Sequence, residues 1–192
     1  NLPNDQRVRE EYGSKSVSLS NVNEAYDNAT PPSMRGEFAW TEEEMERGRR
    51  FGALAGELHT DMHEVIGHAS GRQAAGFTGT PQERIKEHFS ALEEARADLI
   101  ALYFIADPRL VELGIVPAAD HDGILRATYE SYTRNALVQL RRVREGTQIE
   151  GDHMRNRQMV VHWLIANTQA IERREREGKT YLVMVDPQAF RA

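Results

Sequence analysis

The sequence contains no cysteine, so disulfide bonds play no part in the fold, and cysteine usage leaves the redox compartment undetermined. It has no excess of positive charge: the net charge of −6 argues against nucleic acid as a main partner. No apolar run is long enough to suggest a membrane span, and no signal peptide or low-complexity segment is visible. We therefore expect a cytoplasmic protein with neither a nucleic-acid nor a membrane partner.

The composition that remains is that of an ordinary globular domain. The 192 residues are 40% hydrophobic and 28% charged, which is enough for one sizeable core. We therefore expect a single domain over 1–192. The chain starts at Asn1 rather than Met and stops soon after a new element begins, so we expect a piece of a longer protein.

The pattern of apolar residues predicts a mainly α fold. Residues 1–40 have little helical signal, and the alternation over 16–20 predicts a short extended or β segment. Residues 41–177 form the predicted helical core, in which capping boxes begin helices near Thr41 and Thr80. We expect helices over 41–70, 80–106, 124–144 and 150–177, and a short strand over 180–185.

The most informative stretch is 60–69, which places His63, Glu64 and His68 within six residues. Neutral imidazole is a good zinc ligand, and a carboxylate beside the metal can accept a proton from an attacking water. The common zinc-peptidase motif spaces its histidines four apart, but these two are five apart. On a regular helix their rings would diverge by about 140°. Both can face one ion only if the helix holds an extra residue, as a π-bulge does, and Gly67 would tolerate such a distortion.

Other interpretations of this stretch stay open at this point. Seven histidines are present, so a close pair could arise by chance. His59 and His63 are also four residues apart, which is a regular spacing for a metal pair.

A second stretch, 90–98, supplies carboxylates. Ser90 and Glu93 have the spacing of a capping box, which is a sufficient explanation of Glu93. It does not explain Glu94 and Asp98, which lie four apart on one helix face. Carboxylates on a largely apolar helix are costly unless they are paired or bind a metal. The flanking apolar residues are Leu92, Leu99, Leu102 and Phe104.

Together the two motifs resemble the family of dipeptidyl peptidase III, a group of zinc exopeptidases. The family carries His-Glu-x-x-x-His followed by Glu-Glu-x-Arg-Ala-Glu or -Asp, and here the motifs occupy residues 63–68 and 93–98. The resemblance implies one zinc ion per chain. It implies three zinc ligands, one general base and two carboxylates that orient the imidazoles. The zinc ligands would be His63, His68 and Glu94, and the general base would be Glu64. The orienting carboxylates would be Glu93 and Asp98.

The same family has His-Met-x-x-Arg further along, and here it occupies residues 153–157. Taken alone, a histidine near a helix start is more often structural. The resemblance implies that His153 stabilises the developing oxyanion and that Arg157 holds a substrate carbonyl or carboxylate. It also implies that Asn1 and Asn4 border the substrate, although a solvated connector explains that stretch equally well.

We therefore expect a zinc-dependent peptidase that hydrolyses bonds near the N-terminus of short peptides. Whole members of the family have a second lobe for which this sequence offers no candidate, so activity of this piece alone and dipeptide release remain open. One alternative is a metal-binding helical module that serves regulation or scaffolding without catalysis. Glu64 argues against it, because a purely structural site needs no base. Another alternative is a zinc hydrolase of a different amide.

Overall fold

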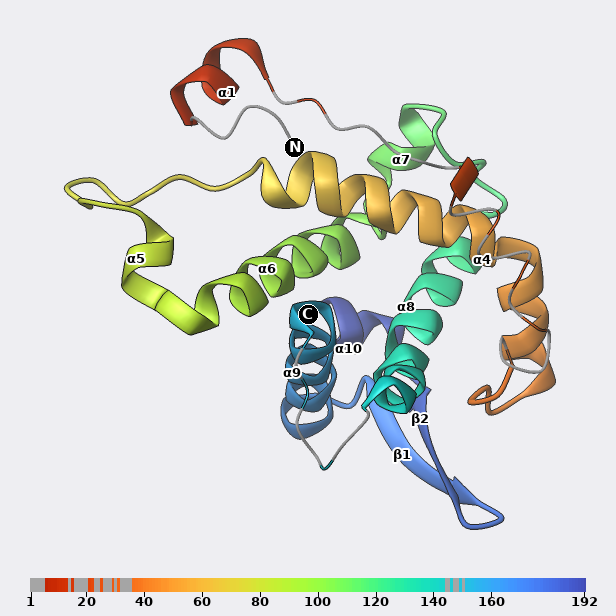
Figure 1. Cartoon of the computed structure of the whole chain (residues 1–192). Coiled ribbons are helices and arrows are strands. Elements are labelled where there is room, and N and C mark those ends of the chain that lie inside the picture. The colour runs from red at the N-terminus through yellow and green to blue at the C-terminus, as the bar shows by residue number, and fades with distance from the viewer. Residues whose placement is uncertain are drawn as a thin grey trace.

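The computed structural model is mainly helical, with one small antiparallel sheet of two strands near the C-terminal end (Figure 1). The predicted fold class is confirmed. The structure describes residues 6–13, 15, 21–22, 25, 29, 31, 36–143, 146, 149 and 151–192. No helix in that part of the chain is both long and apolar enough to cross a membrane.

The longest element is helix α4 (Glu42–Met62), which runs without a break into the π-helix η1 (His63–His68). Its start follows the predicted capping box, because the Thr41 hydroxyl accepts a hydrogen bond from the Glu44 amide. The Glu44 carboxylate in turn accepts one from the amide of Trp40, at 2.8 Å. These two hydrogen bonds fix the start of the continuous helix, α4 with η1, that carries the two histidines.

Helix α8 (His121–Val138) packs across α4, and buried ion pairs join the two. Arg47 donates three hydrogen bonds to Glu130, two of them from Nε, and Arg134 pairs with Glu44. Both carboxylates are about 95% buried, so the pairs are shielded from solvent. These ion pairs attach α4, and with it the π-helix that carries the two histidines, to α8.

The apolar core lies where α8 meets α6 (Phe89–Phe104), α9 (Asp152–Asn167) and the β-hairpin. The ring of Tyr129 stacks on Phe190 of the terminal helix α10 (Pro187–Arg191), with ring centroids 4.1 Å apart. The short helix α7 (Arg109–Glu112) contributes the buried Leu110 to this core. The fully buried side chains include Ile105, Val116, Ile124, Tyr129 and Val161.

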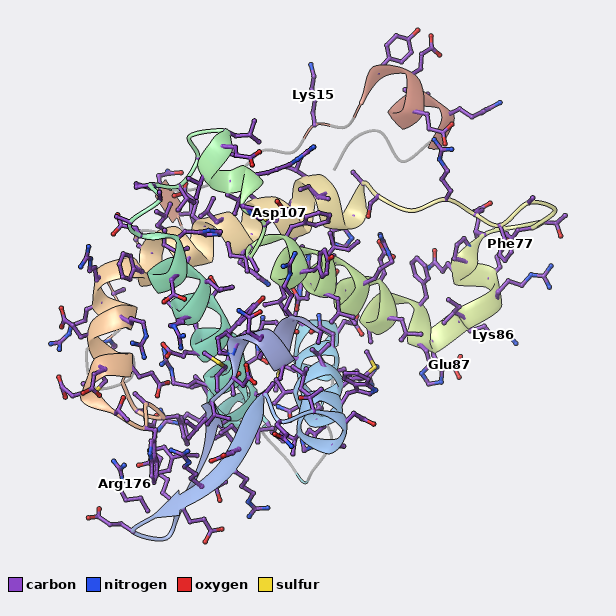
Figure 2. The ribbon with its side chains drawn as sticks, turned by 180° about the vertical axis from the view of Figure 1, so that it is seen from behind. Lys15, Phe77, Lys86, Glu87, Asp107 and Arg176 are labelled. Atoms are coloured by element: carbon purple, nitrogen blue, oxygen red, sulfur yellow. The ribbon has the colours of Figure 1, made fainter. Side chains whose placement is uncertain are left out.

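The single helix predicted over 80–106 is wrong, because the chain turns sharply at Lys86. Helix α5 (Pro81–Ile85) begins at the predicted capping box of Thr80, and a 3₁₀ turn (Lys86–His88) then leads into α6. Lys86 has φ +57°, in the left-handed region that cannot continue a right-handed helix. Residues 71–88 thus form a projecting arm, and Figure 2 shows Phe77, Lys86 and Glu87 at its outer end, away from the helical body.

The helix predicted over 150–177, and with it the end of the helical core at 177, is also wrong. Helix α9 stops at Asn167, and strand β1 (Ile171–Arg176) pairs with β2 (Lys179–Met184), which confirms the predicted strand. Glu177 and Gly178 both have positive φ, as the tightest hairpin turns require. Pairing with β2 overrides the helix propensity of the Glu and Arg run, and Arg176 lies at the tip of the hairpin (Figure 2).

The N-terminal prediction for 1–40 needs one correction. Helix α1 (Gln6–Tyr12) forms within the stretch expected to be extended or loop. Its residues are mostly good helix formers, Gln, Arg and Glu, without glycine or proline. The predicted extended segment over 16–20 lies outside the described residues, as do Asn1 and Asn4.

Candidate metal centre

The five-residue histidine spacing is accommodated by the predicted insertion in the helix. The whole segment from His63 to His68 is π-helical, which adds one residue to the turn and returns both rings to one side. The two imidazole centroids lie 4.7 Å apart, with ring planes at 86°. The π-bulge predicted from the spacing is therefore confirmed.

Gly67 has a different role from the one that the sequence suggested. Its φ lies outside the left-handed region, so backbone freedom is not what this position requires. A Cβ atom at Gly67 would lie 2.8 Å from both Cα and Cβ of Ala97 on helix α6. Glycine is needed here because the π-helix and α6 approach each other too closely for a side chain, and this approach brings the carboxylates of α6 to the histidines.

The three predicted ligands converge on one point. The carboxylate atom Glu94 Oε2 lies 3.1 Å from His63 Nε2 and 3.7 Å from His68 Nε2. One ligand atom from each residue can be chosen so that all three lie within 4.8 Å of one another. Two ligands of a tetrahedral zinc ion with bonds of about 2.1 Å lie about 3.4 Å apart, so these distances fit such an ion.

Glu94 Oε2 provides a second test of fit. It is buried, yet within the described part of the chain no group donates a well-aligned hydrogen bond to it. A buried carboxylate oxygen without a donor is costly unless a cation lies beside it. Two imidazoles and one carboxylate are also the donor set of many catalytic zinc sites. The residues present therefore fit a divalent metal.

Each imidazole is held from behind by a second carboxylate. His63 Nδ1 lies 2.7 Å from Asp98 Oδ1, and His68 Nδ1 lies 3.1 Å from Glu93 Oε1. Because an ionised carboxylate can only accept, each Nδ1 carries a proton, which leaves Nε2, the atom on the side of Glu94, as the nitrogen that can bind a metal. This is the tautomer that a metal ligand needs.

The capping box expected from Ser90 and Glu93 does not form, since His88 is the N-cap of α6, two residues before Ser90. Glu93 instead bonds both His68 and Arg96, whose Nε donates to Oε2 at 2.9 Å. Burial raises the pKa of Glu93, but the hydrogen bonds from His68 and Arg96 outweigh it and lower the pKa to about 2. Glu93 is therefore an anion at neutral pH.

Asp98 is the most enclosed carboxylate of the site, with 2% of its surface exposed. Besides His63, it accepts a hydrogen bond from the Tyr132 hydroxyl at 3.0 Å. Burial raises the pKa of Asp98, but the hydrogen bond from His63 and the nearby cations outweigh it, so the pKa lies below its ordinary value. Asp98 thus stays ionised and can hold the proton on His63 Nδ1.

His59 does not join the converging group. Its Nε2 atom lies 3.7 Å from Asp98 Oδ1, on the side of His63 away from Glu94. Burial lowers the pKa of His59 to about 4, so the ring is neutral at pH 7. The structure therefore favours the pair His63 and His68 over the pair His59 and His63.

Helix α9 brings the third motif to the same place. His153 Nδ1 lies 3.3 Å from Glu94 Oε2, and the His153 side chain is about two-thirds exposed. Arg157 points inward instead: its guanidinium lies over the Tyr132 ring, 4.7 Å from the centroid, and its Nη2 is 3.9 Å from Asp98 Oδ2. Glu64 follows His63 on the π-helix and is partly exposed.

Two residues of this arrangement were not assigned a role from the sequence. Arg96 lies three residues after Glu93 on one helix, and that spacing alone could have indicated the pair. Tyr132 contacts Asp98 across 34 residues, and no local pattern indicates that contact.

The family model of Peptidase family M49 matches residues 1–78 and 76–191. The chain belongs to peptidase family M49. M49 peptidases are metallopeptidases, in agreement with a group of side chains suited to a metal. The resemblance to the dipeptidyl peptidase III family is thereby confirmed.

Two known proteins are similar to this M49 chain. The fold is similar to that of DPP III from Caldithrix abyssi, with a TM-score of 0.69 and 23% identity over 100% of this chain and 34% of that chain. Nudix hydrolase 3 of Arabidopsis thaliana is 33% identical over 108 residues, which cover 54% of this chain and 13% of that protein. The M49 chain thus spans about a third of the DPP III chain and a smaller share of the plant protein.

Proposed function

We propose that this chain forms the zinc-binding catalytic part of a peptidase that hydrolyses bonds near the N-terminus of short peptides, as a dipeptidyl peptidase does. The observation that carries the proposal is the convergence of His63 Nε2, His68 Nε2 and Glu94 Oε2, a buried oxygen to which no described residue donates a well-aligned hydrogen bond. Membership of a family of metallopeptidases and the likeness to a DPP III fold support it. We propose one zinc ion per chain, held by these three residues.

Zinc in this position would supply Lewis-acid chemistry, because it polarises a carbonyl and lowers the pKa of water. Glu64 would accept the proton of the attacking water and deliver it to the leaving amine. Glu64 directly follows His63 on the π-helix and is not one of the three residues of the ligand group, which is compatible with this role. Glu93 and Asp98 would keep both imidazoles in the ligating tautomer throughout the reaction.

His153 would donate a hydrogen bond to the oxyanion that forms from the substrate carbonyl. Its contact with Glu94 and its exposure support this role, because a substrate could reach the ring from solvent. Arg157 was predicted to hold a substrate carbonyl or carboxylate, and this stays a prediction. Its side chain is 15% exposed and lies against Tyr132 and Asp98, so any substrate contact would use the small exposed part of the guanidinium. The predicted contacts of Asn1 and Asn4 also stay predictions.

The test is the variant Glu64→Ala, made in the full-length natural protein. We expect zinc content and thermal unfolding to match those of the wild type, while hydrolysis of a short peptide falls by at least about 10²-fold, as expected when a general base is lost. Retained turnover in Glu64→Ala would remove Glu64 as the base. Zinc binding without hydrolysis in the wild type would favour the alternative of a metal-binding module without catalysis.

A further inference from the structure

The buried carboxylate of Asp98 is contacted by side chains from four elements. His63 of the π-helix and Tyr132 of α8 donate hydrogen bonds to its two oxygens, one to each, at 2.7 and 3.0 Å. His59 of α4 and Arg157 of α9 lie further out, at 3.7 and 3.9 Å. Asp98 is therefore held mainly by two hydrogen bonds, one from a proposed zinc ligand and one from Tyr132.

The two carboxylate oxygens of Asp98 bond different residues, and this affects how His63 is held. Oδ1 faces the imidazole and Oδ2 faces the Tyr132 hydroxyl, so rotation of the carboxylate about its χ2 torsion would break both bonds together. The Tyr132 ring is itself fixed, since Arg157 lies over its face and its side chain is almost fully buried. A rigid donor on Oδ2 thus determines where Oδ1 lies.

Tyr132 can serve only as a donor to Asp98. Burial raises the pKa of Tyr132 well above its usual value, so the hydroxyl keeps its proton at neutral pH. Asn156 Oδ1 is a second acceptor near the hydroxyl, 3.4 Å away, and competes weakly for the same proton, whereas the Arg157 guanidinium beside the hydroxyl can only donate. The shorter bond, to the ionised carboxylate, is the stronger one.

We propose that Tyr132 is a positioning residue for the zinc ligand His63 and acts through Asp98. Its hydroxyl sets the orientation of the carboxylate that fixes the tautomer and ring plane of His63. This inference rests on the proposed zinc site and goes beyond it, because Tyr132 lies two contacts away from the proposed ligand His63 and belongs to none of the motifs. Residues that hold the partner of a ligand contribute to metal affinity.

The chain offers a matched control for this role. Tyr129 lies three residues before Tyr132 on the same helix, and its hydroxyl is also buried and donates one hydrogen bond, to the Leu102 carbonyl at 2.9 Å. That bond does not lead to a proposed ligand. The variants Tyr132→Phe and Tyr129→Phe therefore remove equivalent groups, and only the first should affect the metal.

The experiment measures zinc affinity of the chain by competition with a chromogenic chelator, with Zn²⁺ alone as the probe. We expect Tyr132→Phe to raise the dissociation constant about threefold to tenfold, less than the roughly 10–100-fold of a residue in direct contact with a ligand. Tyr129→Phe should stay within about twofold of the wild type. The visible absorption of the Co²⁺-loaded chain should change in Tyr132→Phe and not in Tyr129→Phe, since it reports ligand geometry.

A double-mutant cycle with Asp98→Asn tests the route of the effect. If Tyr132 acts through the carboxylate, Tyr132→Phe should weaken zinc binding much less in the Asp98→Asn background than in the wild type. Equal losses in both backgrounds, equal losses in the two tyrosine variants, or an unchanged affinity in Tyr132→Phe would each overturn the inference. A wild type that binds no zinc, or a His63→Ala variant that binds it normally, would overturn the zinc site itself and the inference with it.

Discussion

The two imidazoles of the centre are held by carboxylates of unlike surroundings. Glu93 is about a quarter exposed and shares its charge with Arg96, whereas Asp98 is almost fully buried and bonds Tyr132. Both arrangements leave Nε2 as the nitrogen that can bind a metal, but only the second depends on the packing of another helix. Variation at the two positions should therefore have different consequences for metal affinity and for folding.

The first prediction concerns the ligands. His63→Ala, His68→Ala and Glu94→Ala should each remove most of the zinc, because a three-residue site does not hold the ion with two. Glu93→Ala should keep the site and weaken zinc binding by roughly 10–100-fold. Elemental analysis after dialysis measures occupancy, and a chelator titration measures affinity. Full occupancy in Glu94→Ala would exclude Glu94 from the ligand set.

The second concerns His153, tested in the full-length natural protein with a short peptide substrate. If the ring acts on the oxyanion only, His153→Ala should lower kcat by roughly 10²–10³-fold and change KM little. Zinc content should not change, because His153 is not a proposed ligand. Wild-type kinetics in this variant would return His153 to a structural role.

How much of the site could be predicted depended on sequence distance. His63 and His68 sit in one short motif whose spacing indicated a metal pair, and the family resemblance identified Glu94 as the third ligand among nearby carboxylates. The orienting contacts of Glu93 and Asp98 span 25 and 35 residues and were indicated by the family resemblance, not by spacing. Tyr132 lies in a stretch whose periodicity indicates only burial, and the direction of its hydroxyl depends on how α8 packs against α6.

At the scale of the element, the π-helix and α6 form one unit because Gly67 lets them touch. Gly67→Ala should lower the free energy of unfolding by about 1–3 kcal/mol, since the added Cβ would meet the backbone of Ala97. It should also weaken zinc binding, because the two elements that carry the ligands would separate. Chemical denaturation and chelator titration measure the two effects.

Gly56→Ala is the control for that variant. Gly56 lies in α4, the helix that precedes the π-helix, and nothing lies within 4 Å of a Cβ atom added there. Alanine at this position should leave zinc affinity unchanged and raise the free energy of unfolding by up to about 1 kcal/mol, because alanine is the better helix former. If both variants have the same stability, close contact is not the reason for glycine at position 67.

Elements were predictable where local signals decide them and were missed where tertiary pairing does. The start of α4 and of α5 followed from the capping residues Thr41 and Thr80. The stretch 171–176 has a composition that suits a helix, yet it forms a strand because β2 offers a partner and Glu177-Gly178 supplies the turn. The strand conformation of 171–176 is favoured over a helix only when the hairpin with β2 has formed.

At the scale of the whole molecule, the two ion pairs between α4 and α8 support the continuous helix on which the centre is built. Arg134→Met should lower the free energy of unfolding by about 3 kcal/mol, because it leaves the Glu44 carboxylate buried without its cation. The low end of the usual range applies, since the Trp40 amide still donates to that carboxylate. Urea denaturation of the metal-free chain measures the loss.

Two further variants make this prediction specific. The double variant Glu44→Gln with Arg134→Met should recover much of the stability, because no buried charge remains. Arg49→Met removes an exposed partner of Glu42 on the same helix and should change stability by less than about 1 kcal/mol. A loss in Arg134→Met no larger than that of Arg49→Met would show that the buried pair contributes nothing beyond a surface pair.

The hydrogen bonds of Asp98 also impose an order in time. His63 precedes it by 35 residues, and Tyr132 follows it by 34. At about 5–20 residues per second, protein synthesis needs about 2–7 s to advance from Asp98 to Tyr132. During that interval the growing chain already contains all three proposed zinc ligands but lacks the hydroxyl that orients one of them. If zinc bound during that interval, it would meet a His63 that lacks this support, so we expect the full affinity of the proposed site to develop only after translation has delivered α8.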